Sequence, residues 1–305
     1  MSADRPESGI RPGRTNSAGY GDERPGGSLG EGAANLLFPP SCPGCGRRLL
    51  AWRPPYFCSR CRARIRYIVP PLCSCCGLPL TAGGDHLCGD CLRSRFVFSR
   101  ARAAVIYAEP VISPLLAFKY RGEMSLLAPF GALARPLPAE APFGEPELIV
   151  PVPLHPRRLR ARGFNQALLL SRSFFPTHKS RINPDLLLRI RHTDSQRGRS
   201  GRERRRNLRG AFRVAGKEKV AGKTVLLIDD VFTTGTTVNE CAATLLTAGA
   251  AEVAVFTLAR TVRDFSNPST VFPEVSQKSE KGKKFFQEAG NGIIDKITHL
   301  RLFGG

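Results

Sequence analysis

The sequence predicts an α/β protein in which a small metal-binding module precedes a mostly parallel sheet. Two observations support this fold class. Four Cys-x-x-Cys pairs lie close together early in the chain, and farther on two apolar runs each end in polar residues and lead into a helix. Short apolar runs of that kind are typical of strands that a parallel sheet buries on both faces. The chain has 305 residues, which leaves room for a domain of about 160 residues beside the module.

The chain opens with residues 1–35, which are rich in Gly, Ser, Pro and charged side chains and show no apolar periodicity. We expect this segment to be disordered. Residues 36–95 contain the cysteine pairs. Each pair can fill two corners of a tetrahedron, so two pairs can complete a zinc site. The eight sulfurs therefore predict a double zinc ribbon with two structural Zn²⁺ sites, Cys42/Cys45/Cys58/Cys61 and Cys73/Cys76/Cys88/Cys91.

Two alternatives concern these cysteines. Disulfides are one, but no secretory signal opens the chain and the rest of it is typical of a cytosolic protein, which favours zinc and a cytoplasmic location. The other is that Cys75 replaces Cys73 or Cys76 as a ligand. The Cys-Gly step of the first pair recurs at Cys76, which favours Cys76. Four ligands per ion leave no open position, so we expect the zinc to be structural.

The next elements follow from apolar patterning. Residues 103–107 predict a strand, 114–120 and 126–133 predict helices, and 148–152 predict a second strand. After this strand we expect a basic loop that leads into a helix and contains Arg157, Arg158, Arg160 and Arg162. A solvated basic face is the ordinary explanation of one such cluster.

The most informative stretch is 225–237. Val225 to Ile228 predict a buried strand, and Asp229 and Asp230 follow at its carboxyl end, where open α/β sheets bind ligands. Residues 233–237, Thr-Thr-Gly-Thr-Thr, then lead into a helix. The unpaired N–H groups at the start of a helix attract anions, and phosphate is the expected guest. The stretch therefore predicts a cradle for a ribose 5-phosphate group.

Two other interpretations of this stretch are weaker. Solvated carboxylates on an ordinary strand-turn-helix are the simpler one, but adjacent acids followed by such a turn are rarer than either feature alone. A nucleotide triphosphatase is the other, because Gly222-Lys-Thr precedes the strand. Its phosphate loop needs a glycine where this chain has Lys217, and it opens a helix rather than a strand. We therefore exclude it.

Over 225–237 the sequence resembles the type I phosphoribosyltransferases, whose signature is an apolar strand, paired acids and a Thr/Gly phosphate turn. The resemblance implies that Asp229 and Asp230 are the catalytic pair, which holds the ribose hydroxyls of phosphoribosyl pyrophosphate beside an oxocarbenium-like sugar. It also implies Mg²⁺ bound with the pyrophosphate. The implied 5′-phosphate loop consists of Thr233, Thr234, Gly235, Thr236 and Thr237.

Further blocks narrow the family. Arg162, Asn165 and Gln166 lie in an Arg-Gly-Phe-Asn-Gln run, and Arg204 and Asn207 lie in a second basic block. With the cysteines, these blocks resemble the ComF family of competence-associated, phosphoribosyltransferase-like proteins. The resemblance covers roughly residues 36–261 and implies a transferase-like domain at 99–261. It ends there, and the irregular mixture of Ser, Lys, Glu and Pro that follows predicts a mostly flexible extension at 262–305.

The family resemblance also implies substrate-binding residues. Its pyrophosphate would meet Arg157, Arg158 and Arg162, and Arg204 would belong to a loop that closes over the site. Lys119 matches a Lys-Tyr-x-Gly block of the family, although a solvated lysine at the end of a helix is an equally good account of it.

Two functions follow. In the first, the chain binds phosphoribosyl pyrophosphate and serves DNA uptake or processing in natural competence, with single-stranded DNA and a DNA-uptake helicase as partners. In the second, it is an active phosphoribosyltransferase of nucleotide metabolism with an unidentified base or amine acceptor. The sequence leaves open whether catalysis is retained.

Charge favours polyanionic partners under either function. The formal net charge is +21, and nine arginines lie between Arg189 and Arg209 against two acids, more than one pyrophosphate needs. No apolar stretch approaches the roughly 18 residues of a membrane span.

Overall fold

The computed structural model describes residues 39–51, 53–93, 96–135, 143, 145–191 and 208–262. Contacts divide the chain into Met1–Pro40 and Ser41–Gly305, and of the first unit only Pro39 and Pro40 are described. The predictions for residues 1–35 and for the extension after Val262 lie outside the described residues.

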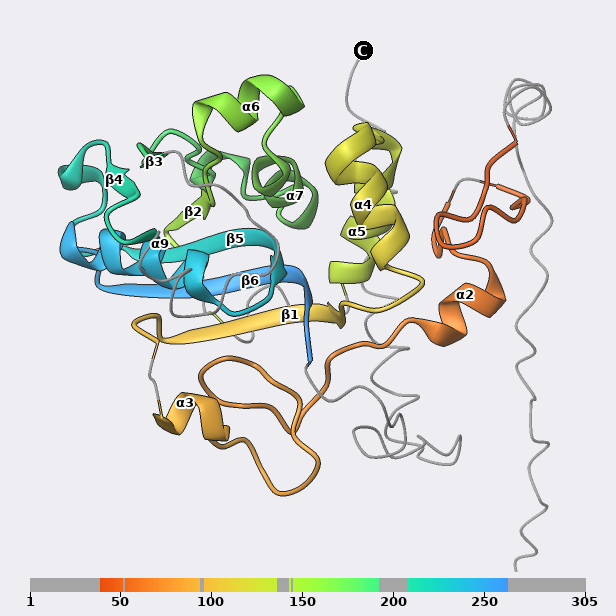
Figure 1. The fold of residues 1–305 in the computed structure, drawn as a ribbon, viewed down its shortest axis with the longest axis horizontal. Helices are drawn as coiled ribbons and strands as arrows, with labels where there is room; N and C mark the ends of the chain where they lie inside the picture. Colours follow the sequence, from red (N-terminus) through yellow and green to blue (C-terminus); the bar gives the residue numbers. More distant parts are fainter. Residues whose placement is uncertain are drawn as a thin grey trace, which may run out of the picture. The chain divides into compact units, whose positions relative to one another are not determined.

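Four parallel strands form the central sheet, in the order β1-β6-β5-β2 (Figure 1). This parallel sheet confirms the predicted fold class. One strand is longer than predicted: β5 continues beyond Ile228 through both acids, because Asp229 still pairs with Thr257 of β6 and Phe232 with Arg260. The strands are β1 (Arg100–Ile106), β2 (Leu148–Pro151), β5 (Thr224–Phe232) and β6 (Glu252–Arg260).

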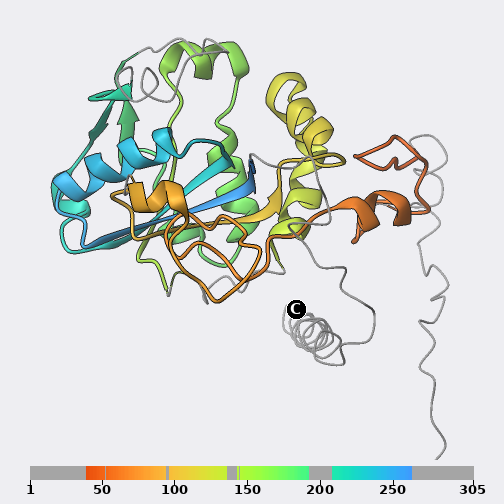
Figure 2. The same cartoon turned by 60° about the horizontal axis from the view of Figure 1, so that its bottom comes forward.

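Alternate residues of β5 enter two different cores, as expected for a strand that is covered on both faces. Val225 and Leu227 pack with helix α9 (Thr236–Thr247) and with the second group of four cysteines. Leu226 and Ile228 pack with the helices of the other face. Those helices are α4 (Ile112–Arg121), α5 (Leu127–Ala134) and α7 (Gln166–Phe174). Figure 2 shows α9 running back along the sheet after β5.

Shorter elements connect these layers. They are α2 (Ser59–Arg64), α3 (Gly89–Arg93), η1 (Met124–Leu126), α6 (Pro156–Arg162), η2 (Lys179–Arg181), β3 (Leu187–Arg189), β4 (Phe212–Val214) and η3 (Lys217–Lys219). β3 and β4 form an antiparallel pair on either side of residues 192–207, which lie outside the described chain. The Arg191 Nη1 atom donates to the Arg209 carbonyl at 2.9 Å, so the two ends of that segment lie together.

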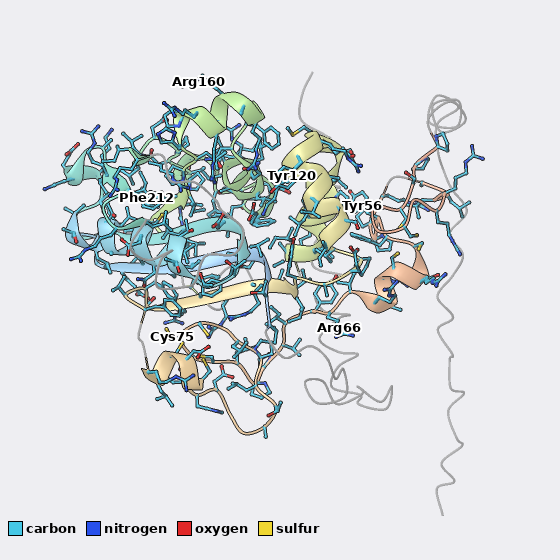
Figure 3. All side chains as sticks on the ribbon, viewed as in Figure 1. Tyr56, Arg66, Cys75, Tyr120, Arg160 and Phe212 are labelled. Carbon is cyan, nitrogen blue, oxygen red and sulfur yellow. The ribbon has the colours of Figure 1, made fainter. Side chains whose placement is uncertain are left out.

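The cysteine-rich part of the chain contacts β1 along the edge that does not pair with β6. Between the two cysteine groups, Ile68 N donates to the Ala104 carbonyl at 3.0 Å, and within the second group the Cys75 carbonyl accepts from Ala101 N at 2.6 Å. Figure 3 labels Cys75 beside this strand. The module is therefore joined to the sheet through main-chain hydrogen bonds as well as through the shared cores.

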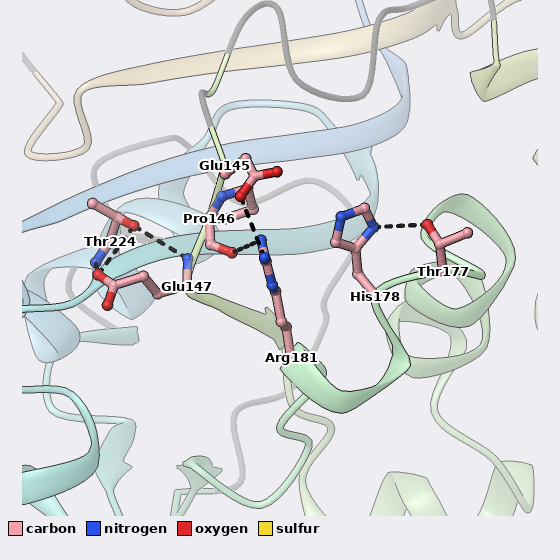
Figure 4. A network of polar contacts seen from close by, with 7 residues as sticks. All are labelled: Glu145, Pro146, Glu147, Thr177, His178, Arg181 and Thr224. Atoms are coloured by element: carbon pink, nitrogen blue, oxygen red, sulfur yellow. Dashed lines mark hydrogen bonds and ion pairs between the residues drawn. The ribbon is translucent and has the colours of Figure 1, made fainter.

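Polar contacts tie the strands together at their amino ends (Figure 4). Glu147, just before β2, accepts from the backbone N–H of Thr224 at 3.0 Å. Arg181 donates to the Pro146 carbonyl at 3.1 Å and to Glu145 at 3.3 Å. The Glu147 bond fixes the start of β2 against β5 at the end of the sheet opposite to the paired acids, and the Arg181 bonds hold η2 against the segment before β2.

Candidate functional site

The paired acids extend past a neighbouring strand. β2 ends at Pro151 opposite Ile228, so Asp229 and Asp230 lie beyond its carboxyl end, in the position where parallel sheets open a crevice for ligands. Lys119, near the end of α4, reaches Asp230 with 2.9 Å between Nζ and Oδ2, and the two side chains are only 18% and 14% exposed. Lys119, a predicted substrate-binding residue, therefore contacts one of the two acids.

Burial and the repulsion between the two neighbouring carboxyl groups determine how readily Asp229 loses its proton. Burial, reinforced by the charge of Asp230, raises the pKa of Asp229 to about 7. Burial alone would lower the pKa of Lys119, but the Asp230 carboxylate outweighs it and raises that pKa. One carboxyl is thus poised to hold a proton near neutral pH while the other is neutralised by an ammonium group, which is a common property of ligand sites.

The turn after β5 is built around Gly235. This residue has φ of +70° and is the N-cap of α9, and its carbonyl accepts from Asn239 N at 2.9 Å. The hydroxyls of Thr234 and Thr236 lie 2.9 Å apart. The first N–H groups of α9 therefore point out of a glycine turn beside the acids, an arrangement that suits a phosphate.

A pocket of about 610 Å³ lies between α4, α6, α7 and the end of β5. Six predicted site residues line it: Lys119, Arg158, Arg162, Asp229, Asp230 and Thr237. Five others are described but are not among its lining residues: Arg157, Thr233, Thr234, Gly235 and Thr236. The remaining one, Arg204, lies outside the described residues.

The arginines after β2 do not form the expected loop. They lie on the short helix α6, which begins with Pro156 at its first turn, is capped by His155 accepting from Arg157 N, and ends at Gly163 with φ of +83°. Figure 3 labels the exposed Arg160 on this helix. A helix presents its residues to different sides, so only part of the cluster reaches the pocket. Arg162 also lies over the ring of Tyr120, 5.5 Å from its centre.

Two polar residues of the pocket that were not predicted as site residues have unusual surroundings. Arg189, the last residue of β3, lines the pocket, and burial together with Arg158 lowers its pKa. Gln166 is only 3% exposed, and its Nε2 atom has no hydrogen-bond partner among the described residues. A local signal existed for each, since Arg189 opens the basic run and Gln166 belongs to the Arg-Gly-Phe-Asn-Gln block.

The eight predicted zinc ligands gather in two groups, Cys42/Cys45/Cys58/Cys61 and Cys73/Cys76/Cys88/Cys91, with the sulfurs of each group within 4.8 Å of one another. Cys45 and Cys58 sulfurs are 3.6 Å apart, and those of Cys76 and Cys88 are 3.7 Å apart. Four sulfurs at about 2.3 Å from one Zn²⁺ would be roughly 3.8 Å apart. Both groups therefore fit structural zinc, and Cys75 is not part of the second set.

At Cys73, backbone N–H groups favour the thiolate form that zinc requires. Burial alone would raise the pKa of Cys73, but N–H donors from Cys88, Cys76 and Cys75 outweigh it and lower that pKa to about 6. All ten cysteines of the chain are free thiols in the structure, in agreement with metal binding rather than disulfides. Among the described residues, no helix has the length and apolar character needed to cross a membrane.

Comparisons with known proteins agree with both parts of the fold. Residues 33–92 match the family model "Double zinc ribbon domain", and residues 183–287 match "Phosphoribosyl transferase domain". Competence protein F of Haemophilus influenzae is 35% identical over 208 residues, which are 67% of this chain and 90% of the relative.

Two further relatives extend this similarity. DNA utilization protein YhgH of Escherichia coli K12 is 39% identical over 211 residues, again 67% of this chain and 90% of the relative. Competence protein ComFC of Bacillus subtilis is 28% identical over 211 residues, 67% of this chain and 83% of the relative. With both domain models matched, the chain belongs to the ComF family of competence proteins, with a double zinc ribbon joined to a phosphoribosyltransferase-like domain.

Proposed function

We propose that the chain binds phosphoribosyl pyrophosphate in the pocket beside Asp229 and Asp230, in the service of DNA uptake or processing. The observation that carries this proposal is the position of the two acids beyond the end of β2, between the turn that opens α9 and the arginines of α6. A ribose diol needs paired acceptors, a 5′-phosphate needs N–H donors and a pyrophosphate needs arginines.

Each group has a distinct task in this proposal. Asp229 and Asp230 accept hydrogen bonds from the ribose hydroxyls, and Arg158 and Arg162 hold the pyrophosphate. Carboxylate oxygens are suitable ligands for a hard cation, and Mg²⁺ bound with the ligand would neutralise part of the pyrophosphate charge. If catalysis is retained, the carboxylates also stabilise positive charge that develops on the sugar.

Isothermal titration of the purified protein with phosphoribosyl pyrophosphate and Mg²⁺ tests the proposal. The double variant Asp229→Asn, Asp230→Asn should lose binding, because each hydrogen bond to a charged acceptor contributes about 1.5 to 3 kcal/mol. A matched control neutralises two exposed acids elsewhere, Asp185→Asn with Glu218→Gln, and should bind like the parent. Equal affinity of both double variants, with unchanged circular dichroism, would contradict the site.

A second candidate function is binding of single-stranded DNA, with a DNA-uptake helicase as a partner. Exposed arginines on α2 and α6 support it, as do the relatives named for DNA utilization and competence. Both functions are compatible with a reducing cytoplasm, where zinc-bound thiols persist.

The basic block at 204–206 separates this candidate from an enzyme in nucleotide metabolism. Replacing Arg204, Arg205 and Arg206 together should weaken DNA binding and flatten its dependence on salt by up to about two units, at roughly 0.7 per phosphate contact. If the triple variant instead binds DNA normally and loses phosphoribosyl pyrophosphate, the block closes over an active site and the enzyme function is favoured.

A further inference from the structure

Three phenylalanines join the second zinc ribbon to the end of β5. Phe96 and Phe98 follow α3 and stack with 4.7 Å between their ring centres. Both meet Phe232 edge-on, at 6.0 and 6.2 Å. Phe98 and Phe232 are 2% and 4% exposed. Since Phe232 is the residue just before the phosphate turn, this aromatic cluster connects the ribbon to the turn directly.

The same segment contacts the turn and the helix behind it. A Cβ atom added to Gly235 would lie 2.6 Å from Phe232 Cζ and 2.8 Å from Phe96 Cε1, so both rings touch the backbone of the turn. Val97 N donates to the side-chain oxygen of Asn239 in α9 at 2.8 Å. The chain that leaves the second ribbon therefore packs against the turn and holds the first part of α9.

Arg260, at the end of β6, contacts both Phe232 and the zinc knuckle formed by Cys73 to Gly77. Its guanidinium lies 4.9 Å from the centre of the Phe232 ring, and its Nη1 atom donates to the Cys76 carbonyl. The next residue, Thr261, bonds the Phe232 carbonyl through its N–H at 3.0 Å and the Thr233 carbonyl through its hydroxyl at 3.3 Å. Two consecutive residues, Arg260 and Thr261, thus contact the knuckle and the turn.

We propose that the second zinc ribbon positions the phosphate turn, with Phe96 and Arg260 as the positioning residues. The inference rests on the proposed function for its ligand, since the turn is taken to bind the 5′-phosphate. It gives the second zinc site a task beyond holding its own loops. The aromatic cluster packs against Gly235 of the turn, Arg260 packs on Phe232 of that cluster, and Thr261 bonds the Thr233 carbonyl, so the N–H groups of α9 keep one direction.

The test compares two ligands that use different halves of the pocket. In Phe96→Ala, ribose 5-phosphate and phosphoribosyl pyrophosphate should bind about tenfold more weakly, the order expected when a hydrogen bond to a charged group is misaligned. Inorganic pyrophosphate, which needs only the arginines, should bind as in the parent. Phe96→Leu keeps apolar contact with Gly235 and should restore most of the affinity for ribose 5-phosphate.

Two further variants distinguish positioning from a general loss of structure. Phe57→Ala removes a buried ring from the first ribbon and should lower the melting temperature without changing affinity for ribose 5-phosphate. Arg260→Met keeps apolar contact with Phe232 but loses the bond to Cys76, and should weaken ribose 5-phosphate binding less than Phe96→Ala does. Equal losses for both ligands in Phe96→Ala, or no loss for either, would overturn the inference.

Hydrogen exchange without any ligand tests the inference separately from the proposed function. The amides of residues 235–239 should exchange faster in Phe96→Ala than in the parent, while two zinc ions per chain are retained. If the parent binds no phosphoribosyl pyrophosphate but this difference is seen, the proposed function fails and the coupling stands. If exchange in these residues is unchanged, the coupling fails whatever the ligand.

Discussion

The two zinc ribbons share a ligand set but differ in the surface that surrounds it. From Ser41 to Arg66 the first ribbon has seven arginines and no acidic residue, whereas from Leu72 to Arg93 the second has two aspartates and one arginine. In the first, the arginines of α2 and of the Cys45-Gly-Arg-Arg turn are exposed. In the second, Arg102 and Arg260 of the sheet bond the knuckle carbonyls. Zinc fixes the fold of each ribbon, and the residues around it decide what the ribbon contacts.

The attachment of the two ribbons differs as well. Phe57 and Ile65 of the first ribbon belong to the core that contains α4, α5 and α7. The second ribbon belongs to the core of α9 and is linked to the phosphate turn. Loss of one zinc should therefore have different effects from loss of the other.

The largest expected difference comes from losing one zinc ligand. Cys73→Ser should release the second zinc and lower stability by several kcal/mol, because binding of structural zinc is folding free energy. Cys42→Ser should release only the first zinc and leave the phosphate turn intact. Zinc content and thermal unfolding of the two variants measure this. Equal loss of affinity for ribose 5-phosphate in both would remove the distinction between the ribbons.

The stability of the ribbons and the stability of the sheet should change with pH in opposite directions, so the effect of pH separates the two. Zinc ligands must be thiolates, so the ribbons lose stability as pH falls. Asp229 has a pKa of about 7 in the folded chain against 3.8 as the ordinary value, so its contribution is lost as pH rises from about 4 to 7, by up to about 4 kcal/mol. Asp229→Asn should thus be more stable than the parent at pH 7 and similar near pH 3.5.

Thermal unfolding of Asp229→Asn and the parent, side by side at each pH, isolates this residue from zinc loss, which affects both proteins alike. The acid would then stabilise the ligand complex at the expense of the free fold, a common cost at binding sites. A variant less stable than the parent at pH 7 would show that Asp229 is ionised and well solvated in the folded chain.

A smaller difference in stability is expected between variants of two equivalent glycines, Gly46 after Cys45 and Gly77 after Cys76. Gly46 and Gly77 both have positive φ, but a Cβ atom on Gly77 would lie 2.4 Å from the Ala101 carbonyl, whereas no atom of the described residues lies within 4 Å of one on Gly46. Gly46→Ala should cost about 1 kcal/mol of backbone strain. Gly77→Ala should cost about 3 kcal/mol, since overpacking is added. Chemical denaturation measures both, and similar costs would mean that the second knuckle is not tightly docked.

The smallest expected effect concerns DNA. Replacing Arg60, Arg62 and Arg64 of the first ribbon by Ala should weaken single-stranded DNA binding and lower its salt slope by about two units. The control replaces three exposed basic residues of the other domain, Arg213, Lys217 and Lys219, and should have little effect. Equal losses from both triple variants would show that net charge matters and that the first ribbon is not a specific surface. Fluorescence anisotropy at several salt concentrations measures this.

Local chemistry made much of this molecule predictable. The spacing of the cysteines predicted the two groups of four, and the Cys-Gly step favoured Cys76, whose sulfur belongs to the second group, over Cys75, whose sulfur does not. An apolar run that ends in two acids predicted β5, but its extension to Phe232 depends on pairing with β6, which the run itself does not encode. The arginines after β2 were wrongly expected in a loop, although Pro156 and Gly163 are ordinary signals for the start and end of a helix.

Long-range contacts account for the rest. Arg189 pairs with Phe212 in the β3–β4 pair and lines the pocket, and no local pattern predicts that. The contact between Phe96 and Gly235 joins residues far apart in the chain and depends on docking of the second ribbon. Such positions are set by tertiary packing, which periodicity and spacing do not report.

The cysteine-rich segment that lies along the free edge of β1 also affects self-association. A strand at the edge of a sheet leaves a row of N–H and C=O groups that can pair with another chain. Here the Ala104 carbonyl accepts a hydrogen bond from Ile68 N, and Ala101 N donates one to the Cys75 carbonyl. The cysteine-rich segment therefore covers this edge of the sheet with its own backbone. Chelation of zinc would free that row, and the chain would then offer β1 as a template for edge-to-edge aggregation before the remaining sheet unfolds.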